Sequence, residues 1–248
     1  MEKQEKQKLD ILYENDCYFV INKPAGLMAH PDGRAKETTL ADILVDTYPE
    51  IKEIGEPWVS PTGEIIYRPG IVHRLDRDTT GALLIAKEQK TFLYFKKQFQ
   101  ERNIKKTYCA FVYGNIKEEK GIIDKPIGKN RKDFRKWSAQ PGARGILREA
   151  VTEYKVLIHA NSAQDFSYIE LSPKTGRTHQ LRVHMKAIHH PIVCDNLYAP
   201  NQVCALGFTR PALHAQVIEF LDLDGKKVTV EAPLPKDFKK ALVTVTKQ

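Results

Sequence analysis

The polar stretch from Arg68 to Gly81 combines residue types that can carry out nucleophilic chemistry. Two carboxylates, Asp76 and Asp78, lie among arginines and a histidine, with apolar pairs on either side. Neighbouring guanidinium groups keep a carboxylate ionised where water is partly excluded, and such a pair at about 4 Å is worth roughly 4 kcal/mol at an effective dielectric near 20. An ionised, poorly solvated aspartate is a competent nucleophile. Taken alone, these residue types favour a tight turn tied by surface ion pairs.

A second polar stretch, from Ser172 to His184, gathers cations where a helix is predicted to begin. The free amides at a helix N-terminus attract anions. Arg177 comes just before the expected cap, Thr178, and its side chain can reach a carboxylate or a phosphate. An ordinary capped surface helix explains this stretch equally well.

The histidines after this point do not predict a metal site. His179, His184, His189 and His190 lack the spacing of known zinc motifs, and no acidic residue stands near them before Asp195. Glycines of the chain fit neither a phosphate-binding loop nor a dinucleotide fingerprint. We therefore expect neither metal nor cofactor.

Positive charge is concentrated in one segment. The net charge is +8, and residues 125–155 hold nine lysines and arginines against three acids. Phe134 and Trp137 stand among these cations, so the segment can follow a phosphate backbone and stack on a base. A solvated basic hairpin is the alternative.

Strands predominate among the predicted elements, and helices are fewer. Alternating and β-branched residues predict strands, and apolar spacing of three and four predicts helices, with Thr38 or Thr39 capping the first. The predicted strands are 9–13, 17–22, 81–86, 106–113, 151–158, 166–171, 212–221 and 227–230, the predicted helices are 38–48, 91–100 and 179–188, and residues 49–70 are predicted to be a loop. This order is typical of an α+β protein with a largely antiparallel sheet.

The chain is long enough for one large domain or two lobes sharing a core. We expect residues 1–8 to form a flexible tail and residues 9–248 to form a single domain. The four cysteines show no paired spacing, so we expect them to be reduced. The first apolar run, 17–21, is too short for a signal peptide or a membrane span, which favours the cytoplasm.

Two motifs carry a resemblance to a known family. The stretch from His73 to Gly81, HRLDRDTTG, resembles the signature loop of the RluA-type pseudouridine synthases, and the stretch from Thr175 to His184, TGRTHQLRVH, resembles a second family motif. NKPAGL with HP near the start, and KTYCAFVYG between the signatures, follow in the family's order. The resemblance implies a catalytic domain with a mixed, mainly antiparallel sheet, flanking helices and a basic active-site cleft.

The resemblance also implies roles for the matched residues. Asp76 would be the nucleophile, Arg177 its ion-pair partner and Tyr108 the residue that stacks on the target base. Leu181 would line the apolar pocket, and Arg74 would enter the RNA where the nucleotide leaves. The remaining substrate contacts that we expect from these motifs are His73, His179 and Arg182.

The implied reaction is an isomerisation of uridine that needs no cofactor. The bond from ribose C1′ to N1 breaks, and the base turns and rejoins through C5. The carboxylate can attack C1′, add to C6 or abstract a proton, and the sequence does not choose among these. Flipping the base costs a few kcal/mol, which stacking at about 1 to 3 kcal/mol offsets. Tyr108 is also a candidate to accept the C5 proton.

The expected partner is a structured ribosomal or transfer RNA, and we expect a monomer without an obligate protein partner or a membrane. Many family members carry an N-terminal S4 module, whereas eight residues precede the first predicted strand here. Lys23, the loop 49–70 with Trp58, and Arg131, Lys132 and Arg135 of the basic segment are the expected RNA contacts. A non-catalytic RNA-binding protein and a nucleoside glycosidase are the alternatives.

Overall fold

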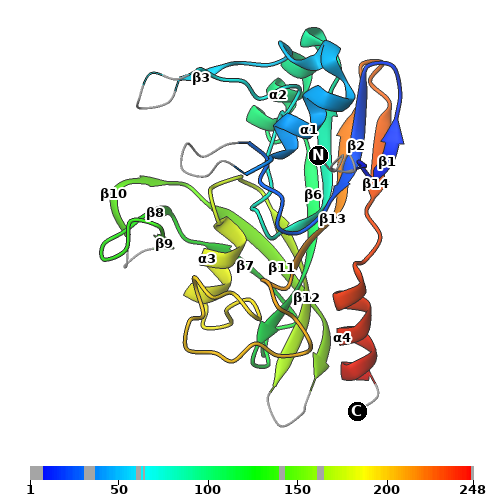
Figure 1. The fold of residues 1–248 in the computed structure, drawn as a ribbon. Coiled ribbons are helices and arrows are strands. Elements are labelled where there is room, and N and C mark those ends of the chain that lie inside the picture. The colour runs from blue at the N-terminus through cyan, green and yellow to red at the C-terminus, as the bar shows by residue number, and fades with distance from the viewer. Residues whose placement is uncertain are drawn as a thin grey trace, which may run out of the picture. The chain divides into compact units, whose positions relative to one another are not determined.

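The computed structural model describes residues 8–30, 37–59, 63, 65–139, 143–160 and 165–246, which fall into two compact units (Figure 1). Unit 1 runs to Ile104 and includes Val217–Ala232, and unit 2 comprises Lys105–Gln216 with the segment from Pro233 onward. All but the last residue of the expected tail, 1–8, lies outside the described residues. The single domain expected for 9–248 stays a prediction.

Unit 1 contains two paired sheet segments and two α-helices. Its elements are β1 (Ile11–Glu14), β2 (Tyr18–Lys23), α1 (Leu40–Thr47), the 3₁₀ helix η1 (Pro49–Ile51), β3 (Trp58–Val59), β4 (Ile65–Ile66), β5 (Thr80–Ala86), α2 (Gln89–Gln100), the second half of β13 (Leu213–Leu221) and β14 (Lys227–Glu231). β2 pairs antiparallel with β1 and β5, and β3 pairs antiparallel with β4.

Apolar side chains of β2, β5 and α2 form the core of unit 1. Tyr18, Leu84 and Phe95 are buried together, and the ring of Phe95 meets the ring of Tyr18 edge-on. α1 begins with a capping box, because the side chain of Thr39 accepts from the amide of Asp42 and the carboxylate of Asp42 accepts from the amide of Thr39. The predicted cap and both predicted helices of this unit are confirmed.

Unit 2 is built on a four-stranded antiparallel segment in the order β6-β12-β11-β7. Its elements are β6 (Lys105–Tyr113), β7 (Lys120–Asp124), β8 (Ile127–Asn130), β9 (Trp137–Ala139), β10 (Ala143–Arg148), β11 (Val151–Ala160), β12 (Phe166–Pro173), α3 (Gln180–Ala187), the first half of β13 and α4 (Lys236–Thr246). Phe111 of β6, Leu171 of β12 and Phe238 of α4 belong to one buried cluster.

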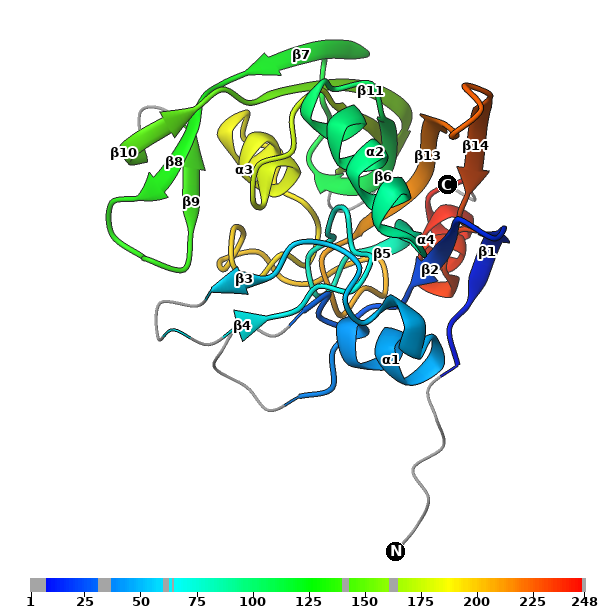
Figure 2. The same ribbon diagram turned by 90° about the horizontal axis from the view of Figure 1, so that it is seen from above.

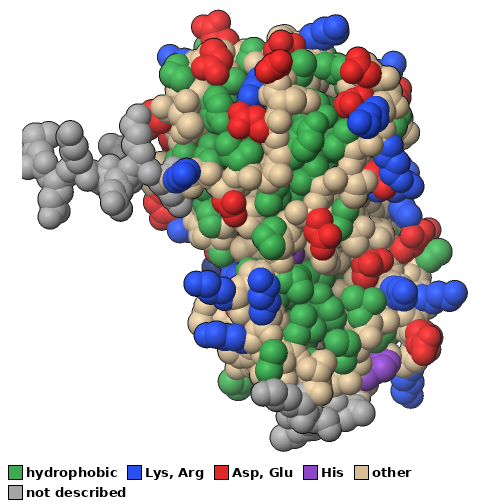
Figure 3. Space-filling model, turned by 90° about the vertical axis from the view of Figure 1, so that its right-hand side faces the viewer, with side chains coloured by type: hydrophobic (Ala, Val, Ile, Leu, Met, Phe, Trp, Pro, Cys, Tyr) green, Lys and Arg blue, Asp and Glu red, His purple; other side chains and the backbone are tan. Residues whose placement is uncertain are grey.

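The strands β8, β9 and β10 form a separate antiparallel sheet that we call the basic arm, residues 127–148. Both ribbon views show these strands as a group beside α3 (Figures 1 and 2). The arm carries much of the basic segment found in the sequence. By contrast, basic and acidic side chains are interspersed across the face drawn in Figure 3.

The structure confirms the α+β class with a mainly antiparallel sheet and few helices. Each predicted strand and helix is present with shifted ends. The predicted loop 49–70 instead contains η1 and the antiparallel pair β3–β4, while β7, α4 and the three strands of the basic arm have no counterpart among the predicted strands and helices. The third predicted helix, α3, starts at Gln180, and its cap is His179 rather than the expected Thr178.

Candidate active site

A buried lysine anchors the loop that carries Asp76. Lys23, at the end of β2, has no exposed surface, and its Nζ donates hydrogen bonds to the carbonyl oxygens of Pro24, Leu27 and Arg77 at 2.7, 2.8 and 2.8 Å. Arg77 is the residue directly after Asp76 in the chain. An ammonium group has three hydrogens, so these three bonds account for its donors. Lys23 thus holds the loop, and its expected contact with RNA stays a prediction.

His73 fastens the other end of the same loop to β5. Its Nε2 accepts a hydrogen bond from the amide of Leu84 at 3.0 Å, and its ring lies 4.7 Å from the ring of Phe99. Because a backbone amide can only donate, Nε2 carries no proton and the neutral ring is protonated at Nδ1. His73 thus positions the loop within unit 1, and its expected contact with substrate stays a prediction.

The arginines beside Asp76 make contacts with other groups. Arg74 Nη1 lies 3.2 Å from His30 Nε2, and Arg77 forms an ion pair of 2.8 Å with Glu37. Both arginine side chains are exposed, whereas Asp76 is half-buried. Within the loop, the carbonyl of Asp76 accepts from the amide of Thr79 at 3.1 Å and closes a tight turn. Asp76, the candidate nucleophile, is thus the first residue of this tight turn.

Gly70 brings the chain into this loop along a path that only glycine can take. Its φ is +64°, and a Cβ there would lie 2.1 Å from the carbonyl oxygen of Ala86. The amide of Ala86 donates to the Gly70 carbonyl at 2.9 Å, so the backbone of the loop entry lies directly against the end of β5. Side chains other than hydrogen are excluded by both conformation and space.

In unit 2, one buried glutamine organises the loop that carries Arg177. Gln180 Oε1 accepts from the Arg177 amide at 3.0 Å and from Thr175 Oγ1 at 2.7 Å. Its Nε2 donates to the carbonyl of Val151 and to Thr152 Oγ1, both at 3.0 Å. Gln180 therefore ties the loop to the start of β11, and this role was missed in the sequence.

Arg177 itself is held at its Nε, which donates to the Glu149 carbonyl at 2.9 Å. That bond leaves the terminal nitrogens of the guanidinium for other acceptors. Leu181, one turn further on, is buried in the core cluster of unit 2, and Tyr108 on β6 packs against the same cluster. Tyr108 and Leu181, two of the expected site residues, thus meet at the same core cluster of unit 2.

Lys106, on β6 two residues before Tyr108, is a site candidate that the sequence did not single out. Its Nζ would lie 4.0 Å from a Cβ built on Gly176, so it reaches the loop of Arg177. Burial lowers the pKa of the Lys106 ammonium below its ordinary value. Asp76 belongs to unit 1 and Arg177 to unit 2, so their pairing stays a prediction.

α3 begins from a left-handed residue and is fixed by a buried ion pair. His179 has φ 56° and ψ 20°, and its side chain forms no cap. Arg182 donates from Nε and Nη2 to both carboxylate oxygens of Asp195, at 2.7 and 2.8 Å, and Asp195 has no exposed surface. These contacts favour a structural role for Arg182, and its expected substrate contact stays a prediction.

The expected RNA contacts of the basic arm lie at its turn. Arg131 Nε donates to the Ala143 carbonyl at 3.2 Å, and Lys132 is exposed. Arg135 pairs with Asp133 through two hydrogen bonds, which lower the pKa of the Asp133 carboxyl to about 2. Phe134 is 64% exposed. The arm therefore presents cations around an open aromatic ring. The other expected aromatic contact, the side chain of Trp58, lies outside what the structure describes.

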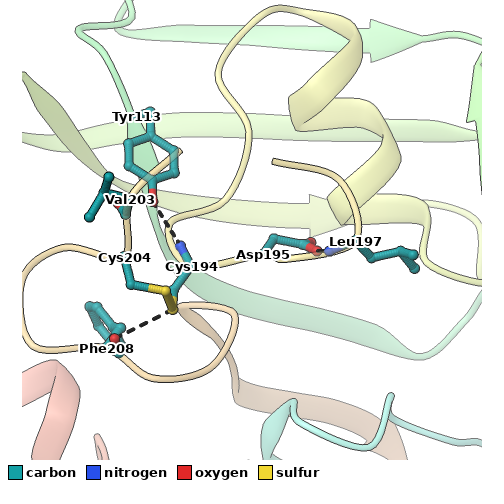
Figure 4. The surroundings of a disulfide bond; sticks show 7 residues. All are labelled: Tyr113, Cys194, Asp195, Leu197, Val203, Cys204 and Phe208. Atoms are coloured by element: carbon teal, nitrogen blue, oxygen red, sulfur yellow. Dashed lines mark hydrogen bonds between the residues drawn. A yellow bond between two sulfur atoms is a disulfide. The ribbon is translucent and has the colours of Figure 1, made fainter. Parts of the chain in front are cut away.

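A disulfide joins Cys194 and Cys204, which corrects the expectation that all cysteines are reduced (Figure 4). Tyr113 Oη accepts from the Cys194 amide at 3.1 Å and donates to the Val203 carbonyl at 2.8 Å. Cys17 and Cys109 are free. Disulfides are uncommon in reducing compartments, so the expected cytoplasmic location stays a prediction.

The described residues contain neither a metal-binding cluster nor a membrane-spanning helix. No group of three or more His, Cys, Asp and Glu in this part of the chain is placed to hold a metal ion. None of its helices combines the length and the apolar character that a membrane crossing requires.

Known proteins resemble this chain over most of its length. A family model described as RNA pseudouridylate synthase matches residues 17–187. A relative from Synechocystis sp., named an uncharacterized RNA pseudouridine synthase, is 38% identical over 95% of this chain and 68% of its own. Ribosomal large subunit pseudouridine synthase D from Vibrio parahaemolyticus is 34% identical over 92% of this chain and 68% of its own.

The fold has solved counterparts. Human RNA Pseudouridylate Synthase Domain Containing 1 superposes with a TM-score of 0.71 at 27% identity, covering 95% of this chain and 87% of that one. Human RNA Pseudouridylate Synthase Domain Containing 4 superposes with a TM-score of 0.70 at 24% identity, covering 96% and 93%, and supports the fold. With a family match over more than half its length, this chain belongs to the RNA pseudouridylate synthase family and is an RNA-modifying isomerase.

Proposed function

We propose that this enzyme isomerises specific uridines of a structured RNA with Asp76 as its nucleophile. The observation that carries the proposal is the anchoring of the Asp76 loop at both ends, by Lys23 and by His73. A nucleophile must be held in a reactive geometry before substrate arrives. A carboxylate on a loop fixed by buried polar contacts meets this requirement, whereas a surface ion-pair turn needs no buried lysine.

Arg177 is the proposed partner that keeps Asp76 ionised. Its loop is fixed through Gln180, and its Nε is already bound to a backbone carbonyl. The terminal nitrogens of its guanidinium match the bidentate geometry of a carboxylate. Arg74 and Arg77 have other described contacts, which favours an arginine from outside the loop for this role.

The reaction balances without an external reactant. The C1′–N1 bond breaks, a C1′–C5 bond forms, the proton at C5 leaves and a proton is added at N1. Attack on C1′, addition to C6 and proton abstraction remain three routes for the carboxylate of Asp76. We assign the base-stacking position to Tyr108, the apolar wall to Leu181 and the intercalating position to Arg74, because a stacked uridine must be flipped before its ring is reached.

The proposed substrate is ribosomal or transfer RNA, and relatives named ribosomal large subunit pseudouridine synthase D favour ribosomal RNA of the large subunit. The basic arm is the proposed RNA-binding surface. Residues 127–148 hold seven lysines and arginines and a single acid, Asp133. Neutralising phosphates with these cations supplies binding energy that is independent of sequence. We propose that the enzyme acts as a monomer in the cytoplasm.

The deciding experiment replaces Asp76 with Asn and measures RNA binding and product separately. Asn is nearly the same size but cannot attack as a carboxylate. We expect unchanged binding and complete loss of pseudouridine, measured by nuclease digestion and chromatography of the RNA. Product formation by the Asn variant would refute the assignment of Asp76.

The mass of the RNA separates this proposal from a glycosidase. Isomerisation leaves the mass of the RNA unchanged, whereas hydrolysis of the C1′–N1 bond releases uracil and lowers it. Pseudouridine maps of total RNA from cells with and without the protein then identify the target. A map without any lost site would contradict a role in ribosomal or transfer RNA.

A further inference from the structure

Tyr198 occupies a position in unit 2 that no motif of the sequence predicts. It lies in the segment after α3 and is 3% exposed. Its ring belongs to a buried cluster that also contains Ile127 of β8, Ala139 of β9 and Val183 of α3. This cluster is therefore the place where the basic arm meets the helix of the second signature motif.

The hydroxyl of Tyr198 touches both of these elements. It accepts a hydrogen bond from the amide of Trp137, the first residue of β9, at 3.1 Å. The same oxygen lies 2.8 Å from Nδ1 of His179, the residue from which α3 begins. One oxygen atom thus joins the backbone of the arm to the side chain that precedes the helix.

The segment that carries Tyr198 is itself fixed from two sides. Asp195 Oδ1 accepts from the amides of Leu197 and Tyr198, both at 3.1 Å, while the same carboxylate binds Arg182 of α3. The neighbouring disulfide from Cys194 to Cys204 closes the loop on its other side (Figure 4). These contacts fix the position of Tyr198 relative to α3.

Two cations of α3 lie near the ring of Tyr198, and one cation of the arm lies over the ring of Trp137. The guanidinium of Arg182 lies 5.1 Å and Lys186 Nζ lies 5.9 Å from the ring centroid of Tyr198. In the arm, Lys129 Nζ lies 4.1 Å from the ring of Trp137. If the backbone at Trp137 shifts, the ring of Trp137 shifts with it, and so does its contact with Lys129 of the proposed RNA-binding surface.

We infer that Tyr198 is a positioning residue for RNA binding, which fixes the basic arm to the start of α3 through its hydroxyl group. The inference rests on the proposed function of the arm as an RNA-binding surface. Phosphate contacts that are already in place cost less ordering on binding. Tyr198 does not touch the reacting atoms in this account, so it acts on affinity and leaves the chemical step alone.

The test compares Tyr198→Phe with wild type in RNA binding and in single-turnover kinetics. We expect the Kd for the RNA substrate to rise about three- to ten-fold, the equivalent of one net hydrogen bond. The rate at saturating RNA should stay within about two-fold of wild type, because Tyr198 does not touch the reacting atoms. A partly unfolded variant would form less product, but the affinity of its folded fraction would not change. An unchanged Kd would overturn the inference.

Tyr113→Phe is the matched control, because it removes a buried hydroxyl that holds the same loop at Cys194 and Val203 without touching the arm. We expect it to leave the Kd unchanged. An equal rise in both variants would assign the effect to loosening of the loop and would refute the connection through Tyr198.

A double-mutant cycle and a spectroscopic signal make the test specific. In a Lys132→Glu background, which already weakens the arm, Tyr198→Phe should raise the Kd by less than it does alone, because coupled sites are not additive. In a Trp58→Phe background, the emission of Trp137 should shift to longer wavelength when Tyr198 loses its hydroxyl. Full additivity together with unchanged emission would contradict the inference, while loss of activity in Asp76→Asn tests the proposed function separately.

Discussion

Lys23 Nζ donates a hydrogen bond of 2.8 Å to the carbonyl oxygen of Arg77, across 54 residues of sequence. The bond crosses from the end of β2 to the loop that carries Asp76, inside unit 1. A lysine without exposed surface is rare unless its donors are satisfied, and here three carbonyl oxygens satisfy them. The position of the candidate nucleophile therefore depends on the last residue of β2, which pairs with Gly81 at the start of β5.

We expect Lys23→Met to lower the free energy of unfolding by about 3 kcal/mol or more, because it leaves three carbonyl oxygens without their donor and each unsatisfied buried group costs about 1–3 kcal/mol. Urea denaturation followed by circular dichroism measures the change. Lys52→Met, at an exposed lysine of the same unit, is the control and should change stability by less than about 0.5 kcal/mol. Equal stability of the two variants would show that the bonds of Lys23 contribute nothing net.

His184 should make stability depend on pH. It is fully buried, its Nε2 lies 3.0 Å from the Lys125 carbonyl, and burial lowers its pKa below the ordinary 6.5. A folded-state pKa below the unfolded value means that the unfolded chain binds the proton first. The contribution of His184 is therefore complete above about pH 6.5 and is lost as pH falls through the lowered pKa.

The melting temperature measured between pH 8 and pH 5 tests this dependence. We expect it to fall on acidification for wild type, and to fall less for His184→Gln, which does not titrate. His189 is exposed, and His189→Gln provides the comparison. Parallel curves for the wild type and His184→Gln would assign the acid sensitivity to other groups.

Reversing the charges of the arm should weaken RNA binding. In Arg131→Glu/Lys132→Glu/Arg135→Glu, cations at the turn of the arm become anions, so we expect a large loss of affinity and a shallower dependence of affinity on salt. Lys236→Glu/Lys239→Glu/Lys240→Glu changes the net charge equally on exposed positions of α4. Filter binding at physiological salt distinguishes the two. The arm would lose its assignment if both triple variants bound equally well.

The disulfide should stabilise the loop after α3. Its two cysteines are 10 residues apart, and closing a loop of this length removes conformational freedom from the unfolded chain worth about 3 kcal/mol. We expect Cys204→Ser to melt at lower temperature under non-reducing conditions, and dithiothreitol to lower the wild type to a similar value. Cys17→Ser, at a free cysteine, should respond to dithiothreitol as the wild type does. A wild type insensitive to dithiothreitol would contradict the prediction.

The sequence predicted elements whose signals are local. β2 and β5 are continuous apolar runs, and Thr39 with Asp42 is a capping box that can be recognised from spacing alone. The same holds for the two signature motifs, because each is a contiguous stretch. Local signals were weaker for α4, where Phe238, Ala241 and Val245 form an apolar face among lysines.

Other features depend on contacts between distant residues, which no spacing reveals. Tyr198 meets Trp137 across 61 residues, and Lys23 meets Arg77 across 54. Charge alone does not tell a buried lysine such as Lys23, or an ion-paired arginine such as Arg182, from an exposed one. The expected RNA contacts of both residues stay predictions. The left-handed start of α3 at His179 was missed for a similar reason, since Thr178 is the better cap by residue type.

The close approach of Gly70 to β5 limits how this loop can vary over evolutionary time. A Cβ at position 70 would collide with the Ala86 carbonyl, whereas a Cβ at Gly26, where φ is +81°, would meet nothing within 4 Å. A library randomised at both positions and selected for folded protein should return only glycine at position 70. At position 26 it should also return asparagine and aspartate, which tolerate the left-handed conformation. The entry to the Asp76 loop is thus closed to sequence drift, while the turn after β2 remains open to it.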